Sequence, residues 1–385
     1  MQYRNFGTLD WQVSALGFGC MRFPTGGQDP KEIDEPEAAR MLRYAIDQGV
    51  NYLDTAYPYH GGRSESFVGE ALRDGYREKV RLATKLPSWK VETSADFDRY
   101  LNEQLERLQT GHIDFYLLHA LKKKWWYTLR DLGVREWAEG AMADGRIGHL
   151  GFSFHDEYEV FEEIVDSYDW TLCQIQYNYM DIEHQAGTRG LRYAASKGLA
   201  VVIMEPLLGG RLVAPPESIQ ALWDTAAQER SPVAWALHWL WQQPEVSVVL
   251  SGMSTFEQVE QNVVVAASAM VGGLKPEELA LVDRVRDAYQ ELCPIPCTQC
   301  GYCMPCPNEV DIPRNFEAYN QGRMYEKPDL ARRSYEWISE ENRASACVQC
   351  GECEEKCPQR IPISEWMGRV HEVLGEGQPY PCALP

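Results

Sequence analysis

The chain has 385 residues, 44% of them hydrophobic and 24% charged, an ordinary globular composition with room for a large domain and an appended module. Its 57 acidic residues outnumber its 37 basic ones and give a formal net charge of −20, which argues against the concentrated positive surface that nucleic-acid binding needs. No apolar run approaches the roughly 18 residues of a membrane span, and the first twenty residues lack a secretory signal pattern, so we expect a cytoplasmic protein without a membrane partner.

Eight short apolar runs rich in β-forming residues occur in the first 290 residues, with amphipathic segments between them. The runs are 16–23, 51–57, 80–87, 113–120, 147–154, 173–179, 199–207 and 247–253. Helical periodicity is found at 36–48, 95–109, 134–144, 158–167, 188–197, 233–242 and 256–267. This alternation is typical of parallel βαβ units, and eight of them predict an α/β fold of the (β/α)8, or TIM, barrel type.

A doubly wound parallel sheet is the alternative fold. It would carry a glycine-rich dinucleotide turn after an early strand, whereas the first run offers Gly17 and Gly19 without a third glycine. The barrel is therefore the fold that we predict.

Polar, titratable residues stand at the carboxyl ends of three successive predicted strands. Asp54 lies in one run with Tyr59 just beyond it, Lys85 lies at the end of the next, and His119 at the end of the third. Each residue alone has an ordinary structural explanation, such as a helix cap or a surface charge. Because a barrel carries its functional groups at the carboxyl ends of its strands, the four together predict an active site.

In these motifs the chain resembles the aldo/keto reductase family. The resemblance runs from about residue 1 to residue 286 and rests on YRNFG and VSALGFGCMRF, followed in order by DTAYPYHGGRSE, ATKLP and LLHA. It implies an N-terminal hairpin, a barrel, an oxidoreductase acting on a small carbonyl or alcohol, and a catalytic tetrad of Asp54, Tyr59, Lys85 and His119.

The chemistry of carbonyl reduction agrees with these four residue types. Reduction needs a hydride at carbon and a proton at oxygen, and a tyrosine with a pKa near 10 is a poor acid–base group at neutral pH. We expect Lys85 to stabilise the phenolate of Tyr59 and lower its pKa, while Asp54 holds the ammonium. His119 would donate a hydrogen bond to the carbonyl oxygen, and Tyr59 would be the acid in reduction and the base in oxidation.

The resemblance also implies a nicotinamide cofactor, NAD(P)(H), lying across the strand ends. It assigns Ser153 and Gln176 to the carboxamide. Phe154 stands where an asparagine is expected beside Ser153, and Met204 stands where a tyrosine would stack on the ring. These two replacements leave a flavin as an alternative occupant of the same groove.

Residues after the last predicted strand bear on the choice between NAD and NADP. Gly252, Met253 and Gln258 stand where the family's NADPH-selective members place Lys, Ser and Arg around the 2′-phosphate, so we expect no strong preference for NADP. The match at Asn262 and the turn at Gly252 still imply an adenine-bearing ligand.

Cysteine usage changes sharply along the chain. Ten of the twelve cysteines lie between Cys293 and Cys382, which predicts a boundary near residue 290, with the barrel over 1–290 and a second domain over 291–385. Nothing in the sequence indicates export, so disulfides are disfavoured. Four cysteines outside the motifs described next are expected to be free or packing thiols: Cys20, Cys173, Cys293 and Cys382.

The other eight cysteines form two ferredoxin-type motifs, CTQCGYCMPCP and CVQCGECEEKCP. The second is a full C-x2-C-x2-C-x3-C-P run, in which three thiolates hold one cubane and the fourth, before the proline, ligates the other cluster. We therefore assign one [4Fe-4S] cluster to Cys297, Cys300, Cys303 and Cys357, and the other to Cys347, Cys350, Cys353 and Cys306. Zinc is the competing metal, but its structural sites usually use paired CxxC knuckles.

The segment between the motifs is expected to be helical, over 314–325 and 328–345, which resembles an α-helical ferredoxin-like domain. Lysines and tryptophans at 122–126 are expected in a loop that follows the fourth strand. There they could meet an anionic or aromatic substrate, form the surface where the ferredoxin-like domain or an acidic partner docks, or simply be solvated.

Three hypotheses about function follow. The favoured one is a carbonyl reductase that uses NAD(P)(H), with the clusters serving structure or electron exchange with a redox partner protein. The second is a flavin in the barrel that exchanges electrons with the clusters, because a flavin converts between hydride and single-electron transfer. The third is an electron-transfer partner with a vestigial barrel.

Overall fold

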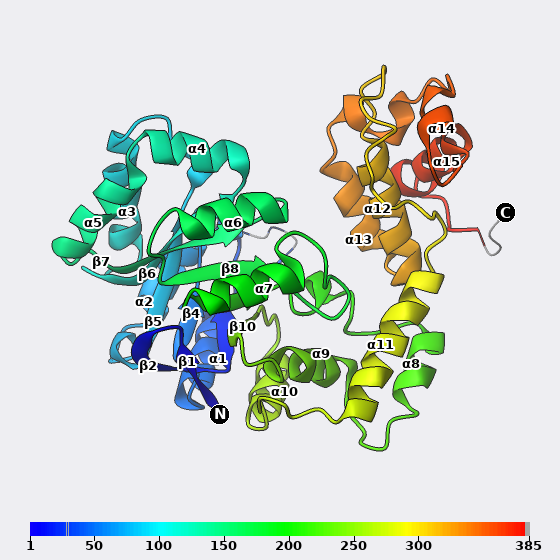
Figure 1. Cartoon of the computed structure of the whole chain (residues 1–385). Coiled ribbons are helices and arrows are strands. Elements are labelled where there is room, and N and C mark those ends of the chain that lie inside the picture. The colour runs from blue at the N-terminus through cyan, green and yellow to red at the C-terminus, as the bar shows by residue number, and fades with distance from the viewer. Residues whose placement is uncertain (28, 30, 382–385) are drawn as a thin grey trace. The chain divides into compact units, whose positions relative to one another are not determined.

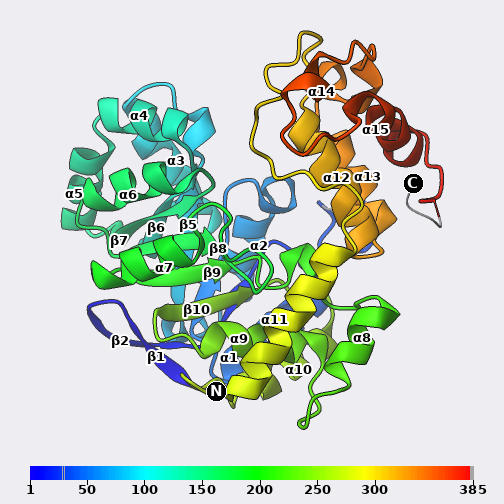
Figure 2. The ribbon, with the colours of Figure 1, turned by 45° about the vertical axis from the view of Figure 1, so that its right-hand side comes forward.

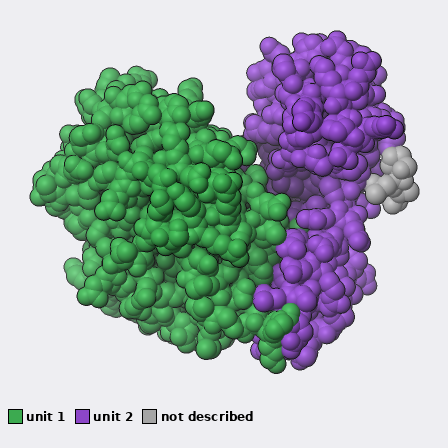
Figure 3. All heavy atoms as spheres, in the orientation of Figure 1, with its two compact units in different colours: residues 1–209, 233–276 green, residues 210–232, 277–385 purple. Residues whose placement is uncertain are grey.

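The computed structural model describes residues 1–27, 29 and 31–381 and divides into two compact units, coloured separately in Figure 3. Unit 1 comprises Met1–Gly209 and Val233–Pro276, and unit 2 comprises Gly210–Pro232 and Glu277–Pro385. By their contacts, residues 210–232 thus group with the C-terminal unit, whereas the predicted domain boundary near residue 290 stays a prediction. Cys382 lies outside the described residues. No helix among them is both long and apolar enough to cross a membrane.

Eight parallel strands close into a barrel in unit 1, and helices surround them (Figures 1 and 2). The strand order around the barrel is β10-β3-β4-β5-β6-β7-β8-β9. The strands are β3 (Leu16–Gly19), β4 (Tyr52–Asp54), β5 (Arg81–Leu86), β6 (Ile113–Leu121), β7 (Ile147–Phe154), β8 (Leu172–Gln176), β9 (Ala200–Met204) and β10 (Val246–Ser251). Each predicted apolar run supplies one strand, so the (β/α)8 prediction is confirmed and the doubly wound alternative is wrong.

The helices of the barrel, with two exceptions, begin and end within two residues of the predicted segments. They are α1 (Glu35–Asp47), α2 (Ser64–Ala71), α3 (Ala95–Arg107), α4 (Lys123–Asp131), α5 (Val134–Ala143), α6 (Tyr158–Asp166), α7 (Gly187–Ser196), α9 (Pro232–Trp241) and α10 (Phe256–Ala266). Helix α1 shows why: Asp34 caps it by accepting a hydrogen bond from the Glu37 amide at 3.3 Å, and its buried residues lie on one face.

Two of these helices, α2 and α4, were not predicted. The segment expected to be a lysine-rich loop forms α4 because Trp126 and Leu129, three residues apart, are buried on one face of it. The three lysines at 122–124 are exposed, which leaves them solvated at the start of this helix.

A hairpin of β1 (Tyr3–Phe6) and β2 (Leu9–Ser14) closes the amino-terminal end of the barrel. Phe6 is fully buried in a cluster with Tyr52 and Phe115, whose ring centroids lie 5.7 and 4.7 Å from its own. Gly7 follows with φ +57, and a Cβ there would lie 2.6 Å from the backbone of the loop before β9. Only glycine allows this approach, so the hairpin fills the end opposite the predicted site.

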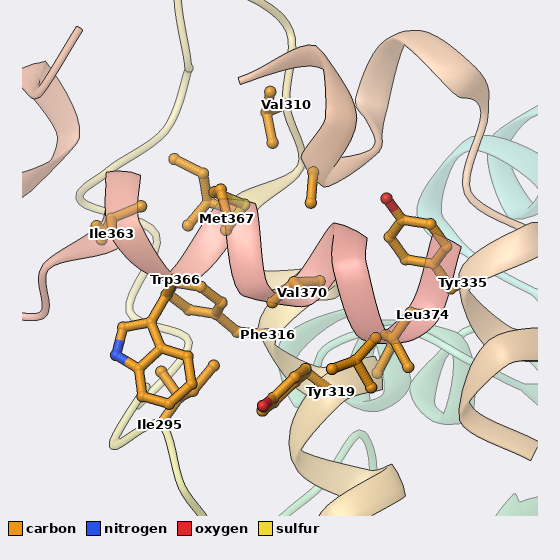
Figure 4. Packing of buried hydrophobic residues seen from close by; sticks show 14 of the residues in the cluster. Ile295, Val310, Phe316, Tyr319, Tyr335, Ile363, Trp366, Met367, Val370 and Leu374 are labelled. Carbon is orange, nitrogen blue, oxygen red and sulfur yellow. The ribbon is translucent and has the colours of Figure 1, made fainter. Parts of the chain in front are cut away.

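Unit 2 is helical. Its helices are α8 (Glu217–Trp223), α11 (Pro276–Glu291), α12 (Ile312–Met324), α13 (Pro328–Glu336), α14 (Glu352–Lys356) and α15 (Ile363–Val370). Its core packs Phe316 and Tyr319 of α12 against Trp366 and Val370 of α15, with Tyr335 from α13 (Figure 4). The predicted α-helical character of the C-terminal region is confirmed.

The second predicted helix of this region is shorter than expected. Helix α13 ends at Glu336 rather than near residue 345, and two short 3-10 turns follow, Glu340–Asn342 and Ala344–Ala346. The Arg343 side chain folds back to donate hydrogen bonds to the carbonyls of Glu336 at 2.7 Å and Ile338 at 2.8 Å. These bonds satisfy carbonyls that a longer helix would have satisfied internally.

Truncating the buried aromatic residue of the hairpin tests its contribution to the barrel. Phe6→Ala is expected to cost about 3–5 kcal/mol, because it leaves a cavity in the inner cluster. The matched control is Tyr3→Ala on the exposed face of the same strand, where the side chain is 47% exposed and the cost is expected near 1 kcal/mol. Thermal unfolding followed by circular dichroism measures both, and equal losses of Tm would contradict the assignment.

Candidate active site and metal centres

The predicted tetrad residues project into the barrel at the carboxyl ends of its strands. Side chains alternate along a strand, so a residue two positions beyond a lumen-facing side chain also faces the lumen. Tyr52, Ala83 and Leu117 belong to the inner cluster, and Asp54, Lys85 and His119 lie two residues beyond them in the same order. Three adjacent strands, β4, β5 and β6, therefore present these side chains to one space.

The ammonium group of Lys85 is the centre of the site. Its Nζ donates to Asp54 Oδ1 at 2.7 Å, to the Thr55 carbonyl at 2.9 Å and to the Tyr59 hydroxyl at 3.3 Å. Lys85 is 1% exposed and Asp54 2%. A buried ammonium needs a counter-charge and acceptors for all three of its protons, and this geometry provides both.

Tyr59 reaches Lys85 from the turn that follows β4. His60 next to it has φ 50 and its Nε2 accepts a hydrogen bond from the Phe23 amide at 3.2 Å. The turn is thereby tied to the segment after β3, which fixes the direction of the Tyr59 side chain.

Burial disfavours the charged form of each of these groups, and the charged neighbours counteract it to different extents. It disfavours the ammonium of Lys85, but Asp54 and Tyr59 offset this effect, so the pKa of Lys85 lies above its ordinary value. Burial raises the pKa of Asp54, and Lys85 and Gln174 act in the opposite direction. Burial likewise raises the pKa of Tyr59 above 10.0, although Lys85 acts to lower it. Lys85 thus acts on the pKa of Tyr59 in the expected direction, but desolvation of the phenolate outweighs it, so the expected net lowering is not found.

His119 completes the group from the end of β6. Its ring centroid lies 6.1 Å from that of Tyr59, with the planes at 82°, and 5.1 Å from that of Trp89. Desolvation, together with the charge of Lys85, holds the pKa of His119 well below its ordinary value of 6.5. The imidazole is therefore neutral at physiological pH, with one N–H to donate. Trp89, which the sequence did not single out, forms a wall beside it.

A polar side chain that the sequence interpretation did not single out lies beside Ser153. Ser153 on β7 lies in register with Gln174 on β8, and the Ser153 hydroxyl accepts a hydrogen bond from the Ala120 amide at 2.7 Å. The amide oxygen of Gln174 is buried without a hydrogen-bond partner. Gln176 lies two residues farther along, and its amide donates to Asp181 Oδ2 at 2.8 Å. The sequence alone does not show which of the two glutamines lies level with Ser153, because that depends on the register of the adjacent strands.

Phe154 does not face the groove. It is fully buried, and its ring packs against Phe161 of α6 at 5.1 Å between centroids, on the outer side of β7. Met204 ends β9 in register with Gln176 and is half-buried. The replacement at Phe154 therefore leaves the polarity of the groove unchanged and gives no support to a flavin.

The residues after β10 serve mainly to begin α10. Thr255 accepts a hydrogen bond from the Gln258 amide at 3.3 Å, and Gln258 Oε1 accepts one from the Ser254 amide at 2.8 Å, which together cap the helix. Asn262 is 4% exposed and donates to Ser251 Oγ at 3.0 Å, so it ties α10 to the strand. Met253 is buried. Of the predicted adenine-side residues, Gly252 and Gln258 are exposed.

The eight motif cysteines gather in two hollows of unit 2, each combining three cysteines of one motif with one of the other. The first hollow is lined by Cys347, Cys350, Cys353 and Cys306 and the second by Cys297, Cys300, Cys303 and Cys357. Apolar side chains of Ile312 and Ile363 line both. A cubane takes one thiolate on each of its four irons, which matches the four motif cysteines of each hollow.

Comparisons with known proteins match two parts of the chain to two different protein families. The model of the aldo/keto reductase family matches residues 15–287, and the model of the 4Fe-4S dicluster domain matches residues 296–361. Probable aldo-keto reductase 1 of Glycine max is 26% identical over 299 residues, which cover 67% of this chain and 82% of that protein. L-galactose dehydrogenase of Arabidopsis thaliana is 26% identical over 316 residues, 76% of this chain and 96% of that protein.

Solved structures agree on the fold. The holo form of aldo-keto reductase AKR11C1 from Bacillus halodurans is 29% identical, with a TM-score of 0.62, and the match covers 74% of this chain and 96% of that one. The family model spans well over half of the chain, and a 4Fe-4S domain follows it. The chain is therefore an oxidoreductase of the aldo/keto reductase family that carries a C-terminal 4Fe-4S dicluster domain.

Proposed function

We propose that the barrel reduces a small carbonyl compound, or oxidises the corresponding alcohol, with NAD(P)H as the hydride donor. The observation that carries this proposal is the buried Lys85 ammonium, which contacts both Asp54 and the Tyr59 hydroxyl. Two similar proteins are named L-galactose dehydrogenase and 6-dehydroglucose reductase, so sugar-derived carbonyls are the first substrates to test.

In reduction, Tyr59 gives its hydroxyl proton to the substrate oxygen while His119 donates a hydrogen bond to the same atom. Lys85 stabilises the phenolate that remains, and Asp54 keeps the ammonium charged and in place. The bound nicotinamide supplies the hydride. In the reverse direction the Tyr59 phenolate accepts the alcohol proton.

The polar groups of the groove fit a carboxamide. The Ser153 hydroxyl accepts from a backbone amide and keeps its own proton to donate, whereas the buried Gln174 oxygen can only accept. A carboxamide offers one carbonyl oxygen and one NH2 group, which complement these two. We therefore propose Ser153 and Gln174 as its partners, with Gln176 and Met204 beside them at the rim.

For unit 2 we propose two [4Fe-4S] clusters, each held by three cysteines of one motif and one of the other, as the two hollows suggest. Clusters pass single electrons, so they are not needed for hydride transfer. We assign them to electron exchange with a redox partner protein or to the stability of the unit.

Removal of the Tyr59 hydroxyl tests the acid–base assignment. Tyr59→Phe is expected to lower kcat for carbonyl reduction by about 10²- to 10⁴-fold and to leave the Kd for NADPH unchanged. Tyr57→Phe is the matched control, because its hydroxyl donates to Glu103 at 3.4 Å and is not among the three acceptors of the Lys85 ammonium. Equal activity of wild type and Tyr59→Phe would support a vestigial barrel instead.

The pH dependence of reduction follows from the two shifted pKa values. Tyr59 keeps its proton to above pH 10 because its pKa is raised, and His119 stays neutral down to well below pH 6.5 because its pKa is lowered. Between these two limits of pH, Tyr59 is protonated and His119 is neutral, which are the forms that reduction needs. We expect kcat for reduction to be flat from about pH 7 to 9 and to fall only above pH 10. A fall in kcat with a midpoint between pH 7 and 9 that disappears in Tyr59→Phe would contradict this.

A pair of cysteine substitutions tests which thiolates share a cluster. Cys357→Ala and Cys303→Ala are each expected to lose about four of about eight irons, and the double variant to lose no more than either alone, since both residues would hold the same cluster. Cys293→Ala, outside both hollows, is the control and should keep all the iron. Iron and sulfide analysis measures this in anaerobic protein. If each single variant lost about half of the iron and the double variant lost nearly all of it, Cys303 and Cys357 would hold different clusters, and each motif would hold a cluster by itself. Carbonyl reduction is expected to continue in Cys357→Ala.

A further inference from the structure

The side chain of Arg22 lies beside the residues that follow β10, a segment whose own sequence offers no cation. Arg22 follows the end of β3, which is adjacent to β10 in the barrel. A Cβ on Gly252, just after β10, would lie 3.2 Å from Arg22 Cγ and 3.3 Å from its Cβ and Cδ. The stem of Arg22 therefore lies directly over the glycine backbone, and any larger residue at Gly252 would displace it.

The backbone that carries Arg22 is fixed on both sides. Its carbonyl accepts a hydrogen bond from Ser254 Oγ at 2.8 Å. Phe23, the next residue, is 3% exposed, packs edge-on against Phe67 at 4.8 Å between centroids, and donates its amide to His60. The position of the Arg22 stem is thus set by the barrel and by the turn that carries Tyr59.

The guanidinium group of Arg22 is unpaired within the described part of the chain. Among the residues that the structure describes, no hydrogen bond or ion pair engages the Arg22 side chain, which is exposed. Arg40 on α1 is a contrasting case: it binds Glu37 at 2.7 Å and lies over the ring of Phe256, the first residue of α10, at 3.6 Å. The carboxylate of Glu257, in the first turn of α10, is engaged by its own helix: its Oε1 accepts a hydrogen bond from the Gln261 side-chain amide at 2.9 Å.

We propose that Arg22 binds a phosphate group of the dinucleotide and takes the place of the cations missing after β10. This inference rests on the proposed use of NAD(P)H and adds a residue that the motif comparison did not contain. A guanidinium presents a planar fork of N–H donors that matches two phosphate oxygens, and the side-chain-free Gly252 leaves room for the Arg22 stem beside the end of β10. A preference for NADP is then physically possible despite Gln258.

Titration calorimetry of the full, cluster-loaded chain tests the proposal with four probes: NADPH, NADH, adenosine 2′,5′-bisphosphate and adenosine 5′-monophosphate. Arg22→Gln is expected to weaken NADPH binding by about tenfold to a hundredfold, because a charge-assisted hydrogen bond is lost. If the 2′-phosphate is the group bound, NADPH and the bisphosphate weaken while NADH does not. If the diphosphate is bound, NADPH and NADH weaken equally.

Two controls separate the possible failures. Arg40→Gln removes a charge that is already paired beside the same helix and is expected to leave every Kd unchanged. Arg22→Lys should recover part of the affinity, because it restores the charge without the fork. Wild type that binds either dinucleotide, together with an Arg22→Gln variant that binds it equally well, overturns the role of Arg22 alone. Wild type that binds neither dinucleotide overturns the proposed function and this inference together.

Discussion

The active end of the barrel depends on keeping one ammonium group charged in a buried place. Lys85 is 1% exposed, and burial alone would drive it to lose its proton. Asp54, the Thr55 carbonyl and the Tyr59 hydroxyl each accept one of its hydrogen bonds, and together they fix the tyrosine against the lysine. Removing one partner of such a pair leaves an uncompensated charge, which is why these residues act as a unit.

The remainder of unit 1 holds Lys85 and its three hydrogen-bond acceptors in place. The hairpin fills the amino-terminal end with Phe6, so the lumen is solid beneath the lysine. Behind β5, the buried Glu65 accepts hydrogen bonds from Thr84 and from Gln104, and Gln104 also donates to the Lys85 carbonyl at 3.1 Å. The strand that carries the lysine is thus anchored by apolar packing below and by a polar network outside.

Unit 2 meets a different requirement, because a cubane needs four thiolates in a setting that water does not dominate. The core around Trp366 and Tyr319 carries the segments on which the two motifs lie, and apolar residues line both hollows (Figure 4). One chain therefore combines a barrel suited to two-electron hydride chemistry with a domain suited to single electrons. Two replacements, Phe154 and Met204, suggested a flavin. Phe154 packs outward against Phe161, so of the two only Met204 bears on the groove.

The local sequence determined the elements: alternating apolar runs and amphipathic segments were enough for eight strands and seven of their helices, and the spacing of the cysteines was enough for the dicluster motifs. It did not determine which side chains from different strands become neighbours. Gln174 lies level with Ser153, and Arg22 lies over Gly252, only because barrel closure fixes the stagger between adjacent strands. The pKa of Tyr59 likewise depends on burial, which the chain acquires when the barrel closes and which outweighs the nearby lysine.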